Sequence, residues 1–200
     1  MTATMARASD VPGRFDYWVL ALSWQPGWCE TTGDKRGAES CRDGTGTGFI
    51  LHGLWPQTFS GWPEYCATRG RDATRAETAA MADIMSSSGL AWHQWKKHGR
   101  CSGLSPADYF ARAREAFEAV RRPSLLREIG RPVRIDPSVV EAAFLDQNPA
   151  MTPASTVVTC RGRYIAEVRI CLTRDHLMPR PCTGPAARAC TKPATLAEIR

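Results

Sequence analysis

The chain of 200 residues is long enough for one domain with a sizeable hydrophobic core. Its 43% hydrophobic and 23% charged residues exclude a mostly disordered protein, and the absence of any continuous apolar run of about eighteen residues excludes a membrane span. The formal net charge of +6 favours an anionic partner only weakly, because the charge is spread over the whole length.

Residues 1–14 are polar and predict a flexible lead-in, followed by a single domain over residues 15–200. The segment 15–24 (FDYWVLALSW) is almost entirely apolar and rich in aromatic side chains, which is typical of a central strand buried on both faces. Residues 25–46 are rich in glycine, threonine and charge and predict a loop. Residues 47–51 (TGFIL) predict a second strand.

Two helices are predicted in the middle of the chain. Residues 73–86 have a helical composition. Residues 92–98 predict a short helix that stops at Gly99, because glycine is the residue favoured just past a helix end.

The second half of the chain mixes helix and strand signals. The sequence SPAD at 105–108 combines an N-cap, a first-turn proline and an early acid, so a helix begins there and should reach about Arg122. An Asp-Pro pair starts a further helix over 136–148. Residues 155–159 and 164–172 predict strands, and the tail beyond them is rich in proline and arginine. Because helices and strands are intermixed without a regular βαβ rhythm, we predict an α+β fold.

The cysteines indicate the redox environment. Their number is even and none forms a C-x-x-C pair, so the usual zinc and redox spacings are missing. Four disulfides in an oxidising compartment are the simplest interpretation, and eight free thiols in a cytosolic protein are the alternative. Residues 1–10 lack the apolar segment of a secretory signal, so we expect that signal to have been removed or to lie ahead of this sequence. The cysteines are Cys29, Cys41, Cys66, Cys101, Cys160, Cys171, Cys182 and Cys190.

Three of the four histidines fall in two short segments. His52 ends the predicted strand 47–51, and the other two lie in the predicted helix 92–98 (WHQWKKH). At about 100° per residue, one side of this helix carries four polar side chains and the opposite side carries two indoles. The polar side consists of His93, Gln94, Lys97 and His98, and the aromatic side of Trp92 and Trp95. We therefore expect the tryptophans to pack in the core and the polar side to face a ligand.

The charge of this polar side points to an anion. Lys97 is cationic and two histidines can become so, and such a group is stable when partly buried only beside an anion such as phosphate. His52, arriving from another strand, would let one histidine accept a proton while another donates one, because an unperturbed imidazole pKa of about 6.5 leaves both forms populated near neutrality. The residues therefore predict phosphoryl transfer that needs no metal.

Other interpretations stay open at this point. The histidines can be structural or exposed, and Lys96-Lys97 can be a solvated face. A zinc site is disfavoured, because the spacing of His93 and His98 places their rings about 140° apart around the helix. Residues 44–48 (GTGTG) lack the Lys-Ser/Thr of a phosphate-binding loop and predict a flexible turn, and His176 is expected in a surface loop.

Two dense motifs resemble the active-site segments of a known family. Residues 49–57 (FILHGLWPQ) resemble the first such segment of the ribonuclease T2 family, and residues 93–101 (HQWKKHGRC) resemble the second, usually H-E-W-x-K-H-G-T-C. Residues 15–29 are similar to the family's opening strand and its continuation, and residues 164–171 to its last long strand. The resemblance extends from residue 15 to about residue 190.

The resemblance implies a metal-independent endoribonuclease of low base specificity, without a cofactor, on a central antiparallel sheet flanked by helices. By the family's roles, His98 takes the 2′-hydroxyl proton and His52 protonates the 5′-oxygen leaving group. Lys97 stabilises the charge that develops on phosphorus, and His93 helps to hold the phosphate. The first product is a 2′,3′-cyclic phosphate, which water opens to a 3′-phosphate. DNA has no 2′-hydroxyl and cannot react.

The resemblance further implies a monomer, secreted or periplasmic and not membrane-bound, that acts on single-stranded RNA. Trp55 belongs to the motif that lines the family's base site, where stacking is tolerant of sequence, and Gln57 is a variable neighbour. Trp62 and Tyr65 can add to stacking or to packing. The implied disulfides are Cys66–Cys101, Cys160–Cys190, Cys171–Cys182 and Cys29–Cys41.

Two positions depart from the second motif. Gln94 replaces the family's glutamate, and an amide keeps the shape and can hydrogen-bond a phosphoryl oxygen, but it carries no charge and moves no proton. An attenuated RNA- or nucleotide-binding homologue is therefore the alternative function. Arg100 replaces threonine, which adds a cation that either contacts RNA phosphate or lies in solvent.

Overall fold

The computed structural model describes residues 11–200. Of the expected lead-in 1–14, residues 1–10 lie outside the described residues. Residues 11–14 form a turn that is attached to the domain, because the Gly13 backbone N–H donates a hydrogen bond to the Cys101 carbonyl oxygen at 2.9 Å.

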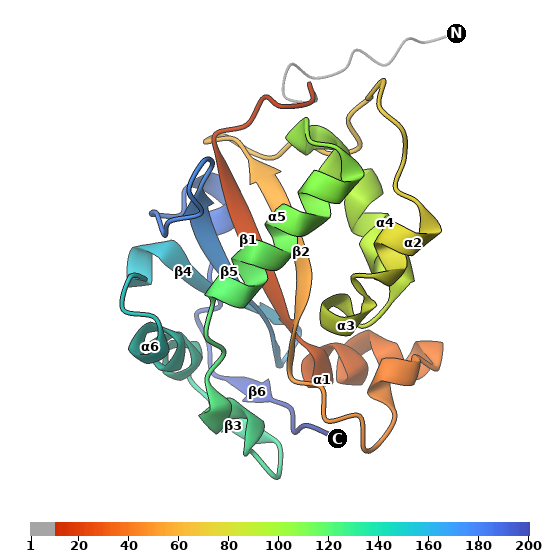
Figure 1. The fold of residues 1–200 in the computed structure, drawn as a ribbon. Coiled ribbons are helices and arrows are strands. Elements are labelled where there is room, and N and C mark those ends of the chain that lie inside the picture. The colour runs from red at the N-terminus through yellow and green to blue at the C-terminus, as the bar shows by residue number, and fades with distance from the viewer. Residues whose placement is uncertain (1–10) are drawn as a thin grey trace, which may run out of the picture.

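A six-stranded sheet forms the centre of the fold (Figure 1). Strand β1 pairs antiparallel with β2 on one side and with β5 on the other. Beyond β5 lie antiparallel β4 and, through a single parallel pair, β6, which carries the short β3. The strands are β1 (Tyr17–Trp24), β2 (Phe49–Gln57), β3 (Val133–Ile135), β4 (Thr156–Arg161), β5 (Tyr164–Thr173) and β6 (Ala194–Leu196).

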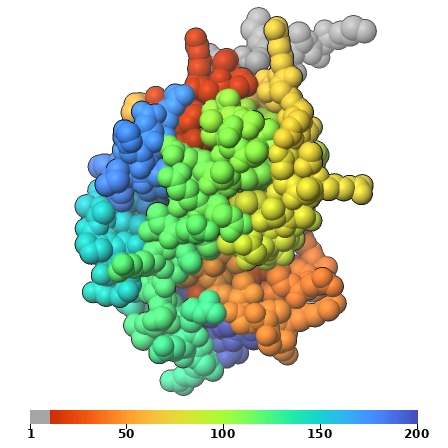
Figure 2. All heavy atoms as spheres, viewed as in Figure 1, coloured from red at the N-terminus to blue at the C-terminus, as the bar shows by residue number. Residues whose placement is uncertain are grey.

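The helices complete the predicted α+β architecture. Helix α5 crosses one face of the sheet, α2 to α4 lie beside the β2 edge, and α6 lies near β4 (Figure 1). Figure 2 shows α5 and its neighbours forming a continuous surface over that face. The helices are α1 (Gln25–Trp28), α2 (Arg75–Ala79), α3 (Ala82–Met85), α4 (Ser88–Lys97), α5 (Pro106–Ala119) and α6 (Pro137–Gln147).

Strand β1 is buried on both faces, as predicted for segment 15–24. Its alternate side chains Trp18, Leu20, Leu22 and Trp24 join the large core beneath α5. Tyr17 and Val19 point to the opposite face, where a smaller cluster includes Trp55 of β2. This second face is only partly covered, and it carries the functional groups.

Several predicted boundaries were wrong. Two short helices lie within residues 73–86, and residues 25–41 of the predicted loop 25–46 form short helical turns. Helix α5 ends at Ala119, not at Arg122, because Val120 is extended and buried. The three-residue strands β3 and β6 were not predicted.

The first motif lies inside a strand, which corrects the expectation that His52 ends one. Strand β2 continues through Pro56 to Gln57. A proline is tolerated there because β2 is at the edge of the sheet. The register between β1 and β2 shifts opposite His52, where Ala21 pairs with Gly53 and Leu22 with Leu51.

Helix α4 begins earlier than residue 92, at Ser88, because the Ser87 side chain caps it by accepting the Leu90 N–H. The α-helix stops before Gly99, as predicted, because Lys97 is its last residue and His98 its C-cap; Gly99 begins a 3₁₀ turn (Gly99–Ser102). Any larger residue at position 99 would clash, because a Cβ would lie 2.5 Å from the Trp95 ring.

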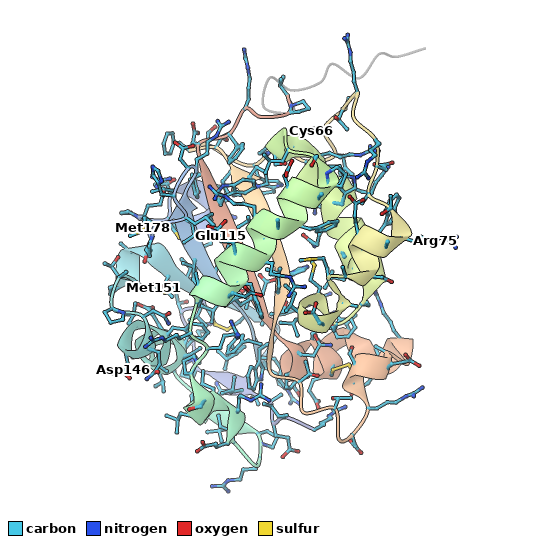
Figure 3. All side chains as sticks on the ribbon, in the orientation of Figure 1. Cys66, Arg75, Glu115, Asp146, Met151 and Met178 are labelled. Atoms are coloured by element: carbon cyan, nitrogen blue, oxygen red, sulfur yellow. A yellow bond between two sulfur atoms is a disulfide. The ribbon has the colours of Figure 1, made fainter. Side chains whose placement is uncertain are left out.

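Four disulfides cross-link the fold, in the same pairing that the resemblance implies. Cys66, labelled in Figure 3, joins the loop after β2 to Cys101 in the turn after α4. Each bond is expected to contribute about 2–4 kcal/mol to stability. Within residues 11–200, no helix is long and apolar enough to cross a membrane.

Candidate active site

A cleft of about 560 Å³ lies on the face of the sheet opposite α5. Strand β2 supplies part of its wall, α4 another part, and β5 supplies Arg169. The two motifs, far apart in sequence, therefore meet in one place. The predicted residues that line the cleft are His52, Trp55, Gln57, His93, Gln94, Lys97 and His98.

His52 is bound to a buried carboxylate that the sequence analysis did not identify. Its Nδ1 lies 2.5 Å from Oε1 of Glu167 on β5. Burial would raise the pKa of Glu167, but the hydrogen bond and charge of His52, together with the charge of Arg169, lower it to about 2. Because an ionised carboxylate only accepts hydrogen bonds, Nδ1 of His52 carries a proton and Nε2 is the free ring nitrogen.

Glu167 is further held by Arg169, two residues along the same strand face. Its Oε2 accepts from Arg169 Nε at 2.8 Å, and a second guanidinium nitrogen is 2.7 Å away. The signal that could have identified it was present in the sequence. A glutamate in the mostly apolar strand YIAEVRIC has to be buried or paired, and a buried carboxylate needs a cationic partner.

His98 is in the opposite electrostatic situation. It caps the C-terminus of α4 and is only 6% exposed. Its buried Nδ1 has no hydrogen-bond partner among residues 11–200. Burial, together with the charges of Lys97, His52 and His93, lowers the pKa of His98 to about 3. The imidazole is therefore neutral at physiological pH and able to accept a proton.

The indole of Trp55 contacts both imidazoles. It stacks on His98 with ring centroids 5.2 Å apart and meets His52 edge-on, also at 5.2 Å. The guanidinium of Arg169 lies 5.3 Å from the Trp55 ring. Trp55 lines the cleft as expected, and its contacts also pack it against both histidines.

Gln94 is 1% exposed and orients Trp55 in turn, because its Oε1 accepts the indole N–H at 2.7 Å. Gly53 makes this contact possible. A Cβ at that position would lie 2.3 Å from Gln94 Oε1 and 2.5 Å from Trp55 Nε1. With its oxygen engaged, Gln94 has its amide NH₂ group left as a donor.

The remaining polar groups set the charge of the cleft. Lys97 lies 3.4 Å from the exposed carboxylate of Glu64. His93 lies at the exposed rim, and burial followed by the charges of Lys97 and His52 lowers its pKa. Gln57 donates from its side-chain amide to the Pro56 carbonyl, at 2.9 Å.

Some predicted positions lie elsewhere. Arg100 does not line the cleft, because its guanidinium is paired with Asp72 at 2.5 Å. Trp92 was expected in the core with Trp95, but it is 42% exposed and lies 5.4 Å from the Lys96 ammonium. The buried residues of α4, which are Ala91, Gln94 and Trp95, share one side of the helix, and Trp92 lies away from that side.

Two aromatic residues near the cleft differ in position. Trp62 lines the cleft and is 46% exposed, whereas Tyr65 is exposed and does not line it. His176 is exposed, as expected. Among residues 11–200, the one group of side chains with metal-ligating spacing contains Cys29 and Cys41, whose sulfurs are joined in a disulfide.

Comparison with known proteins agrees with this arrangement. The Ribonuclease T2 family profile matches residues 15–182. A ribonuclease of Aeromonas hydrophila is 30% identical over 175 residues, which cover 86% of this chain and 79% of that protein. Ribonuclease I of Escherichia coli is 30% identical over 215 aligned positions, covering 82% and 78%. The structure of RNase NT in complex with 5′-AMP superposes with a TM-score of 0.66 at 21% identity, covering 92% of this chain and 98% of that one. The chain belongs to the ribonuclease T2 family.

Proposed function

We propose that this protein is an endoribonuclease that cleaves RNA by transphosphorylation without a metal. It forms a 2′,3′-cyclic phosphate and then hydrolyses it to a 3′-phosphate. The ribonuclease family and its ribonuclease relatives support the activity. The observation that carries the mechanism is the unequal environment of two imidazoles that contact the same indole, since only His52 is paired with a carboxylate.

The division of roles follows from that difference. His98 is buried beside Lys97 without a carboxylate, which favours its neutral form, so it acts as the general base. His52 donates its Nδ1–H to the ionised Glu167, which orients the ring and leaves Nε2 free, so it acts as the general acid through Nε2.

The reaction proceeds in two steps. His98 accepts the 2′-hydroxyl proton, the 2′-oxygen attacks phosphorus, and His52 gives its proton to the departing 5′-oxygen. Lys97 and His93 lie beside the phosphoryl oxygens and offset the charge that develops on them. In the second step the roles reverse. His52, now deprotonated, activates a water, and His98 returns its proton to the 2′-oxygen. DNA lacks the nucleophile and is not cleaved.

Base specificity is low in this proposal, because the groups near the base site offer few directed hydrogen bonds. The side-chain amide of Gln57 is engaged by its own strand, and Trp55 and Trp62 present ring surfaces that accept any base. Single-stranded RNA is preferred because its bases are free to stack. We further propose a monomer that acts in a secreted or periplasmic setting, where four disulfides persist.

The test is incubation of the purified protein with single-stranded RNA in the presence and absence of EDTA, with analysis of the ends formed. We expect equal cleavage in both, with cyclic phosphates appearing before 3′-phosphates. A DNA strand of the same sequence is the control and should remain intact. Cleavage that EDTA abolishes, or products with 5′-phosphates, would contradict the proposal.

The attenuated homologue remains the second candidate because of Gln94. The amide oxygen already makes the contact to Trp55 that a glutamate oxygen would make. We therefore expect Gln94→Glu to change kcat/KM on RNA by less than tenfold, equivalent to about 1.4 kcal/mol of transition-state stabilisation. A gain of a hundredfold or more would instead favour the attenuated homologue.

A further inference from the structure

A second and larger hollow continues from the catalytic cleft. This groove has a volume of about 1100 Å³ and shares His52, His93 and Arg169 with the cleft, whereas His98 and Trp55 do not line it. Its size exceeds what one small ligand requires and suits a stretch of polymer. Its further walls are formed by the segment after β1, by the end of β4 and by Arg188.

Three arginines in this groove have no anionic partner among residues 11–200. Arg36, Arg161 and Arg188 are exposed, and no ion pair or side-chain hydrogen bond involves their guanidinium groups. By contrast, the groove's fourth arginine, Arg169, is paired with Glu167. With four arginines against Glu39 and Glu167, the lining has a net positive charge.

Disulfide bonds constrain the chain segments on both sides of the groove. Cys29–Cys41 closes the segment that carries Arg36. Cys160–Cys190 joins the end of β4, next to Arg161, to the chain that follows Arg188. The three cations are therefore mounted on a constrained backbone, which lowers the entropic cost of binding an extended chain.

We infer that this groove binds the RNA strand on the 3′ side of the scissile phosphate, with Arg36, Arg161 and Arg188 engaging backbone phosphates beyond the leaving nucleotide. This rests on the proposed function, because the direction comes from His52. The group that protonates the 5′-oxygen of the leaving strand faces the groove, whereas the base His98 faces only the cleft.

The test compares a dinucleoside monophosphate with the same dinucleotide extended by three nucleotides on its 3′ side, and with a 5′ extension of equal length. We expect the 3′ extension to raise kcat/KM by about tenfold and the 5′ extension to raise it less. In the triple variant Arg36→Gln, Arg161→Gln, Arg188→Gln the gain from the 3′ extension should disappear. The slope of log kcat/KM against log salt for the 3′-extended substrate should become shallower by about 2, because three phosphate contacts are lost.

Arg134→Gln is the matched control, because Arg134 is exposed on β3 outside the groove and should keep the gain. Equal thermal unfolding of all variants establishes that the fold is retained.

If the triple variant keeps the gain, the inference is overturned while the proposed function stands. If the unmodified protein cleaves none of the substrates, the proposed function fails, and the inference is decided by binding of a 3′-extended oligonucleotide with a 2′-deoxy scissile position. Its fluorescence anisotropy should give at least tenfold weaker binding to the triple variant, and equal binding would overturn the inference.

Discussion

Replacement of His98 by alanine is expected to lower kcat/KM on RNA by about 10³-fold or more, and His52→Ala should have an effect of the same size. Each substitution removes one of the two proton-transfer groups, and neither neighbour can replace it. The ammonium of Lys97, which pairs with Glu64, only donates hydrogen bonds, and Glu167 is ionised and has no proton to donate. The measurement is steady-state cleavage of a fluorogenic RNA oligonucleotide.

The matched control is His176→Ala, which removes an exposed imidazole far from the motif positions and should leave the rate within a factor of two. Circular dichroism and thermal unfolding distinguish loss of chemistry from loss of fold. If either catalytic variant retained more than a tenth of the activity of the unmodified protein, the division of roles between the two imidazoles would be wrong.

Glu167→Gln is expected to lower kcat/KM by about 10²-fold at neutral pH. The amide keeps the shape of the carboxylate but removes its charge, and its NH₂ group can donate to Nδ1 of His52. The neutral imidazole would then carry its proton on Nε2 and act as a weak acid. In this proposal the carboxylate acts through His52, as a positioning residue.

The pH dependence separates this role from a structural one. In the unmodified protein the acid limb of kcat/KM arises when His98 becomes protonated, and its pKa of about 3 places that limb at low pH. Glu167→Gln should lower kcat/KM and leave this acid limb in place, because Glu167 is not among the causes of the lowered His98 pKa.

Glu141→Gln replaces a partly buried carboxylate on α6, is the control, and should change neither kcat/KM nor the acid limb. A loss of activity in Glu167→Gln that came with a displaced acid limb would indicate disturbed packing around His98 instead of a lost partner of His52. Thermal unfolding should be measured for both variants, because loss of a buried partner leaves the Arg169 charge uncompensated.

Local signals in the sequence predicted the elements that local chemistry determines. Helices α5 and α6 begin where their Ser-Pro and Asp-Pro motifs indicate, and β1, β4 and β5 lie where apolar runs predict strands. Strands β3 and β6 were missed because three residues carry no periodicity and pair only through tertiary contact. The break within 73–86 likewise has no breaker residue in the sequence.

The two motifs predicted the site residues that lie within them. Residues whose role depends on tertiary packing were not predicted. The resemblance identified His52 and His98, and the cleft contains both. It did not identify Glu167. This residue reaches His52 because β5 pairs with β1 on the side opposite β2, and because the Glu167 side chain lies on the same face of the sheet as His52. Arg100 was misassigned for the converse reason, because Asp72 comes from a loop whose path no local pattern predicts.

The indole of Trp55 acts as a spacer. It contacts His52 on one strand and His98 at a helix end, so a rigid side chain with two torsion angles links the positions of the two proposed proton-transfer groups. The chain that connects these two segments does not have to supply that precision. Insertions or deletions in the connecting loops are therefore compatible with catalysis, provided that this one aromatic ring and the amide that holds it are kept.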